Sequence, residues 1–154
     1  MGEVLKRRLK QEKFNDTLHE AILNILVVAG HIRERLDRYC ESYGITPGQY
    51  NVLRILRGVY PNGHPRGEIA ARMVERAPDV TRLIDRLENQ RLVERDRSRK
   101  DRRLSITRIT KRGLELLDRM DPDREMHKHF GERISQRDRR DLSRICEELY
   151  GPEE

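Results

Sequence analysis

The feature that most constrains this chain is a change of hydrophobic period near residue 91. Before it, residues 66–74 and 79–90 each carry apolar side chains at helical spacing, with a short turn between them. After it, residues 92–96 and 104–109 contain β-branched residues in partial alternation and flank a highly charged turn. This order predicts a helix-turn-helix followed directly by a β-hairpin, which is the arrangement of a winged helix.

Helical patterns flank this core on both sides. A long helix is expected over about 14–44, and its stretch 22–30 is apolar on most sides, which indicates burial from several directions. In so small a protein, burial of this kind points to a second subunit. We therefore expect one domain, 1–154, that is mainly α with a small β-hairpin wing. Its winged-helix core would span about 46–110, between dimerisation helices at about 14–44 and 111–150.

The sequence also marks several helix ends. Gly44 is expected to stop the long helix, and Thr46-Pro47-Gly48-Gln49 predicts a helix start with a capping box. Ser135 is expected to cap the last helix, about 136–150. The residues expected to face inward on the two short helices are Ile69, Ala70 and Met73, and Val80, Leu83, Ile84 and Leu87. The last helix carries an apolar stripe of Leu142, Ile145, Cys146 and Leu149, which is expected to help form the dimer interface.

Positive charge is concentrated in one part of the chain. Lys and Arg number 33 against 27 Asp and Glu, which gives a net charge of +6. Residues 91–112 alone hold ten basic and three acidic residues, a net +7, so the rest of the chain is close to neutral. A focused basic segment is typical of a nucleic-acid-binding surface.

The second helix of the predicted helix-turn-helix carries the first group of candidate DNA-binding residues. An α-helix fits the major groove, where outward polar side chains reach base edges. Arg82 is the candidate for direct base recognition, because a guanidinium pairs bidentately with guanine. The alternative is a solvated helix surface in which these arginines pair with Asp85 and Glu88. The outward residues of this helix are Asp79, Thr81, Arg82 and Arg86.

The tip of the predicted hairpin carries the second group. A guanidinium there can enter the narrow, electronegative minor groove. Asp101 would repel the phosphate backbone, so we interpret it as a group that orients neighbouring arginines. The candidate residues of the wing are Arg97, Arg99, Lys100, Asp101, Arg102 and Arg103.

Residues 66–113 resemble the winged-helix core of the MarR family, the multiple-antibiotic-resistance regulators. The matching segments are Gly67–Arg72, Val80–Glu88, Leu92–Arg95, Asp101-Arg102-Arg103 and Ile109–Gly113. The resemblance implies a cytoplasmic homodimer that binds a pseudo-palindromic duplex operator, most commonly as a repressor. It also implies that Arg103 enters the minor groove and that Asp101 holds Arg86. Arg91 departs from the pattern, since the family commonly has glycine there.

The resemblance further implies a small aromatic or phenolic effector, bound between the dimer helices and the winged domain. Tyr39, Tyr43 and Tyr50 are the candidate pocket residues, and the alternative is that they belong to the core or the interface. The runner-up function is a winged-helix module that binds protein or RNA in an assembly, because a basic hairpin also suits RNA.

Other classes of function have little support in the sequence. Nucleotide-binding and hydrolase motifs are absent from it, so we expect no enzyme, no catalytic residue and no cofactor. No apolar run could span a membrane. Cys40 and Cys146 each lie in an apolar stripe, so both are expected in the core rather than as redox sensors. A metal site at Glu125, His127 and His129 is not expected, because alternate helix positions do not face each other.

Overall fold

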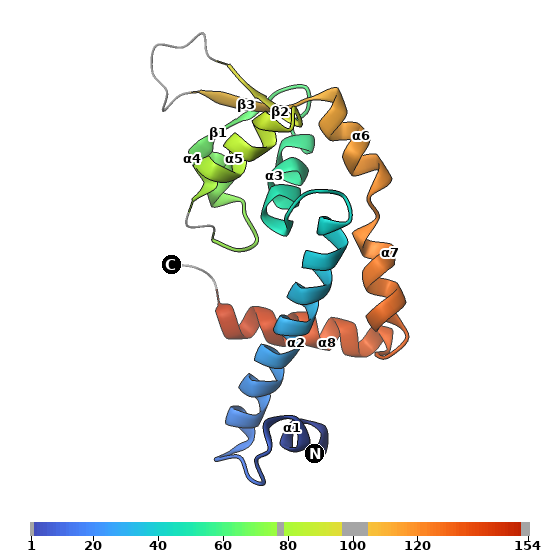
Figure 1. Ribbon diagram of the computed structural model, residues 1–154. Coiled ribbons are helices and arrows are strands. Elements are labelled where there is room, and N and C mark those ends of the chain that lie inside the picture. The colour runs from blue at the N-terminus through green and yellow to red at the C-terminus, as the bar shows by residue number, and fades with distance from the viewer. Residues whose placement is uncertain (1, 77–78, 97–104, 152–154) are drawn as a thin grey trace. The chain divides into compact units, whose positions relative to one another are not determined.

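The computed structural model describes residues 2–76, 79–96 and 105–151. They form two compact units, Met1–Leu114 and Glu115–Glu154. The described chain is mainly helical with one small antiparallel sheet, so the predicted fold class is confirmed (Figure 1). None of its described helices is long and apolar enough to cross a membrane. The single domain over 1–154 stays a prediction.

The first unit begins with two helices and then builds the winged helix. Its elements are α1 (Glu3–Leu9), α2 (Thr17–Glu41), α3 (Pro47–Arg57), β1 (His64–Pro65), α4 (Arg66–Ala71), α5 (Val80–Asn89), β2 (Val93–Arg95) and β3 (Ile106–Ile109). Helix α6 (Lys111–Arg119) starts in this unit. The second unit continues with α7 (Pro122–Met126), a π-helical turn η2 (His127–Gly131) and α8 (Gln136–Tyr150).

The predicted helix starts are confirmed by their hydrogen bonds. In α3, the Thr46 hydroxyl accepts from the Gln49 backbone N–H at 3.3 Å, and the Gln49 side chain accepts from the Thr46 N–H at 2.9 Å. The same two-way pattern joins Ser135 and Asp138 at the start of α8. Gly44 has φ 75°, as expected of a residue that ends a helix. Satisfied end groups of this kind fix where each helix begins.

The sheet has one strand more than the sequence pattern predicted. Its order is β1-β3-β2, and β3 pairs antiparallel with both neighbours. The β2–β3 pair is the predicted hairpin, whereas β1 is only two residues long and too short to show a periodicity. The close approach of the chain before β1 requires glycine, because a Cβ on Gly63 would lie 2.1 Å from the Thr107 carbonyl oxygen.

The core of the first unit lies among α3, α4, α5 and the sheet. Helix α3 contacts α4, α5 and β3, and α5 also contacts β2. Completely or almost completely buried side chains come from each of these elements: Leu53, Leu56, Ile69, Ile84, Leu87 and Val93. The expected inward set on α4 is partly wrong: Ile69 is buried, but Ala70 is exposed and Met73 half-buried. The helix ends at Ala71, so these last positions do not complete an inward face.

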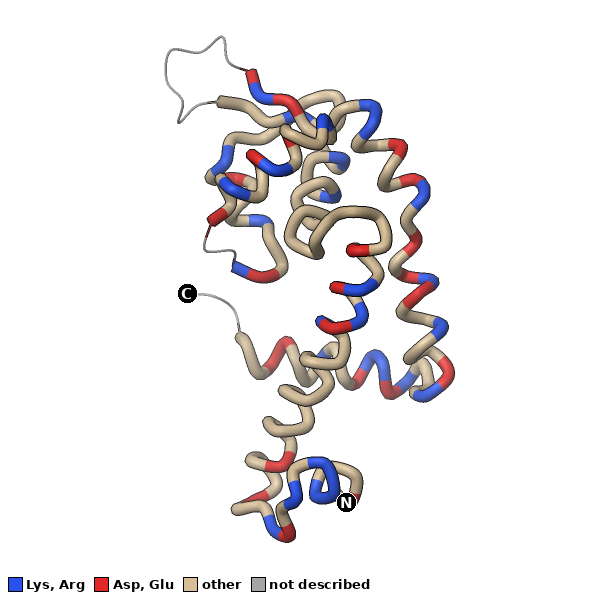
Figure 2. Tube along the Cα trace, viewed as in Figure 1, with Lys and Arg blue, Asp and Glu red and all other residues tan. Residues whose placement is uncertain are grey.

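Two long helices present apolar side chains to solvent. Helix α2 has no charged residue between Ala21 and Ile32, a stretch drawn in tan in Figure 2. Leu18 and Leu26 in α2 are each 62% exposed. In α8, the apolar stripe is exposed as well: Leu142, Ile145 and Leu149 at 43–52%. These are the faces that the sequence predicts to lie in a dimer interface, and that interface stays a prediction.

Candidate nucleic-acid interface

Asp79, one of the DNA-binding candidates, caps the start of helix α5 with its side chain. The Asp79 carboxylate accepts from the Arg82 backbone N–H at 3.0 Å, and its second oxygen lies 3.0 Å from Arg82 Nε. The carboxylate therefore caps the first turn and also forms an ion pair with the Arg82 guanidinium. The Arg82 side chain itself remains 79% exposed.

The two faces of α5 differ completely in character. Val80, Ile84 and Leu87 point inward, with exposed fractions between 0% and 7%. On the opposite side, Arg82 and Arg86 are exposed. Thr81 is half-buried on the flank of this outer face. The structure thus brings the helix candidates together on one surface, and their role in binding DNA stays a prediction.

The acidic residues of α5 are held by a side chain from the sheet. Arg95 in β2 donates to the Asp85 carboxylate and lies 3.9 Å from the Glu88 carboxylate. The Arg95 side chain is only 24% exposed. This arrangement differs from the alternative in which Asp85 and Glu88 neutralise the helix arginines. The outer face of α5 consequently presents Arg86 and the Asp79–Arg82 ion pair.

The connection from α5 to the wing contains a residue in the left-handed backbone conformation. Arg91 has φ 60°, a conformation that glycine adopts more easily. Its N–H bonds to the Glu88 carbonyl at 2.9 Å, and the Leu92 N–H bonds to the Leu87 carbonyl at 2.9 Å. These two bonds form a Schellman motif, with buried Leu92 packing next to the helix end. Arginine here therefore preserves the geometry that glycine would give.

Hydrogen bonds at the start of α6 join the end of β3 to the connection between α5 and β2. The Thr110 hydroxyl donates to the Arg91 carbonyl at 2.8 Å and accepts from the Gly113 N–H at 3.1 Å. The Thr110 backbone N–H bonds to the Leu92 carbonyl at 3.0 Å. A Cβ on Gly113 would lie 2.4 Å from that carbonyl oxygen, so only glycine fits. The Thr-x-x-Gly sequence thus fixes where the second wing strand leaves the sheet.

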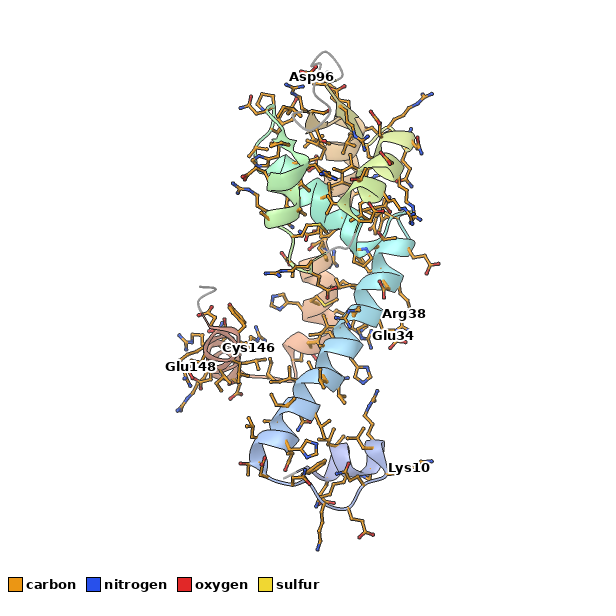
Figure 3. All side chains as sticks on the ribbon, turned by 90° about the vertical axis from the view of Figure 1, so that its left-hand side faces the viewer. Lys10, Glu34, Arg38, Asp96, Cys146 and Glu148 are labelled. Carbon is orange, nitrogen blue, oxygen red and sulfur yellow. The ribbon has the colours of Figure 1, made fainter. Side chains whose placement is uncertain are left out.

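The described part of the wing is its base. Val93 pairs with Ile109 and Arg95 with Thr107, so the two strands are in a defined register. Asp96 lies just beyond β2 (Figure 3). Its carboxylate is 3.8 Å from the Arg108 guanidinium. The wing candidates lie outside the described residues, and they include Asp101, the partner proposed for Arg86. These candidates are Arg97, Arg99, Lys100, Asp101, Arg102 and Arg103. Their roles stay predictions.

Arg66 is a residue of this surface that sequence reasoning missed. Arg66, the first residue of α4, donates from Nη1 to the Thr81 hydroxyl at 3.0 Å. The two residues are 15 positions apart and lie on different helices. Sequence periodicity describes one helix at a time, so no pattern in the chain indicated this contact.

The two cysteines occupy different environments. Cys40 in α2 is 1% exposed, as expected of a core residue. Burial, with a smaller contribution from Asp37, raises the pKa of its thiol to about 11. Since the thiolate is the reactive form, this thiol is poorly suited to redox sensing. Cys146 in α8 is only half-buried, so the core assignment is wrong for it within a single chain (Figure 3).

Most of the remaining candidate residues, for a metal site and for an effector pocket, contact residues four positions away in the chain. His129 Nε2 lies 2.7 Å from the Glu125 carboxylate one helical turn away. No group of three possible metal ligands occurs among the residues that the structure describes. The rings of Tyr39 and Tyr43 contact each other, with centroids 5.3 Å apart, and the Tyr50 hydroxyl accepts from Arg54 at 3.0 Å. The effector pocket stays a prediction.

Comparison with known proteins identifies the family to which this fold belongs. A sequence model of the MarR family matches residues 43–104. A MarR transcription factor from Planctomyces limnophilus has 32% sequence identity and a TM-score of 0.67, over 88% of this chain and 98% of its own. The chain belongs to the MarR family. This placement agrees with the resemblance that the helix-turn-helix and the hairpin carry.

Two further MarR-type proteins extend the comparison. The transcriptional regulator MhqR of Bacillus subtilis (strain 168) is 27% identical over 92 residues, which are 60% of this chain and 62% of that regulator. The match therefore spans less than two thirds of MhqR. The S. aureus MepR–DNA complex contains a chain with the same fold, at a TM-score of 0.71 and 19% identity. That alignment covers 90% of this chain and 98% of MepR.

Proposed function

We propose that this MarR-family chain is a cytoplasmic, homodimeric transcription regulator without enzymatic activity. In this proposal, α5 enters the major groove of a pseudo-palindromic operator and the wing enters the flanking minor groove. The observation that carries it is the outer face of α5. Arg86 and the Arg82 side chain, which pairs with Asp79, are exposed there, while Arg95 pairs with Asp85 and lies 3.9 Å from Glu88. A helix with this charge separation presents guanidinium groups to base edges and phosphates.

Two findings support duplex DNA as the partner. The relatives that match are transcription regulators, and the S. aureus MepR of similar fold was solved as a complex with DNA. The basic segment 91–112 follows α5 directly, so both would act on the same duplex. The runner-up, a module that binds protein or RNA, has no observation of its own in the structure and becomes an outcome of the test.

The homodimer is supported by the exposed apolar faces of α2 and α8. Leu18 and Leu26 on α2, and Leu142 and Leu149 on α8, are between 49% and 62% exposed. Exposing such side chains to water is unfavourable by roughly 1.5–3 kcal/mol each, compared with burying them completely. A second copy with the same faces would cover them about a two-fold axis. Two copies of α5 would then meet two half-sites of the operator.

We further propose that this regulator is a repressor and that a small aromatic or phenolic molecule releases it from DNA. Tyr39, Tyr43 and Tyr50 supply half-buried phenolic rings near the end of α2 and the start of α3. Rings of this kind stack on aromatic ligands, and a hydroxyl gives them a polar contact. Displacement of the chain from its operator by simple phenolic acids, measured by fluorescence anisotropy, tests this part.

The experiment for DNA binding is a selection from random duplexes followed by a titration. The wild-type chain should enrich a pseudo-palindrome with half-sites about 10–10.5 bp apart, or a multiple of this spacing. Arg82→Ala should reduce discrimination at one base pair of each half-site by about 1–3 kcal/mol. The matched control is Arg144→Ala in α8, where the arginine pairs with Glu148 on the same helix.

Two results would contradict the proposed function. One is equal or better binding of single-stranded RNA, which favours the runner-up module. The other is an affinity that does not fall with salt, because contacts to phosphate release counterions and give a slope of roughly −0.9 per phosphate neutralised.

A further inference from the structure

A hydrogen bond between α4 and α5 affects which base atoms the exposed surface of α5 can recognise. Arg66 Nη1 donates to Thr81 Oγ1 at 3.0 Å, so a side chain from α4 reaches the first turn of α5. Arg66 is exposed, and Thr81 is half-buried on the flank that also carries Asp85 one turn later. In helix-turn-helix proteins, the N-terminal residues of the recognition helix contact base edges. Thr81 therefore occupies a position where its hydroxyl can face a base.

This hydrogen bond changes the chemistry that Thr81 offers. A threonine hydroxyl has one proton to donate and two lone pairs to accept with, whereas a guanidinium only donates. Arg66 uses one lone pair of Thr81 and places a positive charge beside the oxygen. The second lone pair is still available, but a donor such as an amino group of adenine or cytosine would have to approach it beside the Arg66 cation. Donation by the hydroxyl proton is therefore favoured over acceptance of a second hydrogen bond.

We propose that Arg66 is a positioning residue that makes Thr81 a hydrogen-bond donor to an acceptor atom in the major groove. This inference rests on the proposed function. The acceptors displayed there are N7 and O6 of guanine, N7 of adenine and O4 of thymine. Arg66 thus determines specificity through Thr81, and it need not touch the DNA.

Helix α4 supplies its own matched control. Arg72 lies on the exposed surface next to α4 and pairs with Glu68 one turn earlier, at 3.3 Å. It has the same side chain as Arg66, but Glu68 belongs to α4 rather than to α5. Arg72→Ala removes a basic side chain near the same helix and leaves the Thr81 hydroxyl bonded to Arg66.

The test is a binding titration of the full chain with the duplex that the wild type selects and with every single base-pair variant of it. The proteins are wild type, Arg66→Ala, Arg66→Lys, Thr81→Val, Thr81→Ser, the Arg66→Ala/Thr81→Val double variant and Arg72→Ala. Thermal unfolding confirms that each variant is folded. Each titration is repeated at several salt concentrations.

We expect Arg66→Ala and Thr81→Val to lose discrimination at the same base pair, by roughly 3- to 10-fold each, as for one hydrogen bond. The double variant should lose no more than either single variant. Arg66→Lys and Thr81→Ser keep a donor and a hydroxyl, so they should retain most of the discrimination. Arg72→Ala should behave as wild type, and Arg66→Ala should leave the salt slope unchanged.

The inference is overturned if the two single effects add, or if they fall on different base pairs. It is also overturned if Arg66→Ala weakens all duplexes equally and lowers the salt slope by about 0.9, because Arg66 then contacts a phosphate itself. A wild-type chain that selects no duplex overturns the proposed function and this inference with it. A wild type that selects an operator while Arg66→Ala keeps full discrimination overturns the inference alone.

Discussion

Helices α5 and α8 carry the same apolar spacing and meet different surroundings. Val80, Leu83, Ile84 and Leu87 in α5 and Leu142, Ile145, Cys146 and Leu149 in α8 both lie at i, i+3, i+4 and i+7. In α5, three of the four side chains are at most 7% exposed. In α8, three of the four are at least 43% exposed.

The difference shows what an amphipathic pattern does and does not specify. The face of α5 is covered by elements of its own chain, because α5 contacts α3, α4 and β2. The face of α8 is left open in the single chain. Periodicity identifies an apolar face, but the covering surface can come from the same chain or from another copy. In the proposed dimer, the first face builds the DNA-binding core and the second pairs two such cores.

The largest expected effect comes from removing a side chain under the α5 face. Leu87 is completely buried, and Leu87→Ala should lower the free energy of unfolding by about 2–5 kcal/mol. Urea unfolding monitored by circular dichroism measures this loss. Leu149→Ala in α8 is the matched comparison, since Leu149 is 52% exposed in the single chain. Equal losses for both variants at every protein concentration would show that the two faces do not differ.

A charge on the α8 face should break the proposed dimer and leave the chain folded. Ile145 is 43% exposed in the single chain, so glutamate there is tolerated in a monomer. In a dimer it would bury an unpaired carboxylate, which is unfavourable by several kcal/mol. Ile145→Glu should therefore raise the dimer dissociation constant by roughly 100-fold or more, as measured by size-exclusion chromatography over a dilution series. A dimer that survives this change would rule out α8 as its interface.

The reactivity of the two cysteines tests the same contrast between buried and exposed apolar faces. The pKa of Cys40, raised to about 11 by burial, keeps its thiol protonated at neutral pH. Alkylation by iodoacetamide at pH 7.5 should therefore be about 100-fold slower at Cys40 than at an ordinary exposed thiol, and it should accelerate as the pH approaches 11. Cys146 should react faster in Ile145→Glu than in wild type, because the dimer would cover it. Mass spectrometry of labelled peptides measures both rates, and fast labelling of Cys40 at pH 7.5 would contradict the burial.

The smallest effect is expected at the end of α5. Arg91 adopts φ 60°, which is unfavourable for a residue with a Cβ by roughly 1–2 kcal/mol. Arg91→Gly should therefore stabilise the fold by about 1 kcal/mol, reduced by the greater flexibility of glycine in the unfolded chain. The shift in the urea midpoint measures it. A clear destabilisation would mean that the Arg91 side chain makes contacts that outweigh the backbone conformation.

Much of the fold could be predicted from the sequence because local chemistry specifies it. The caps at Thr46 and Ser135 and the left-handed Gly44 are formed by residues within one turn of each other. The period change near residue 91 likewise marks the step from α5 to β2, and the Thr110-x-x-Gly113 start of α6 is another local signal. Each of these depends on neighbours in the chain, so the sequence displays it.

The rest depends on contacts between distant residues. Strand β1 is defined by two residues that pair with β3. The role of Arg95 in holding the acidic residues of α5 was not predicted, because its partners lie on another element. The Arg66–Thr81 bond is another contact of this kind. Helix α1 was also not indicated, although Leu5 in it is only 3% exposed. Periodicity records the faces of single elements and carries no information on which faces meet.

The central claim is that the faces of α2 and α8 pair two chains so that two α5 helices bind one operator. Sedimentation equilibrium of the wild-type chain with the selected pseudo-palindromic duplex tests it most directly. The complex should have the mass of one duplex and two 18.4 kDa chains, and the protein alone should sediment at twice 18.4 kDa at micromolar concentration. A folded protein that remains at 18.4 kDa, or a stable specific complex of one chain with one duplex, would contradict the claim.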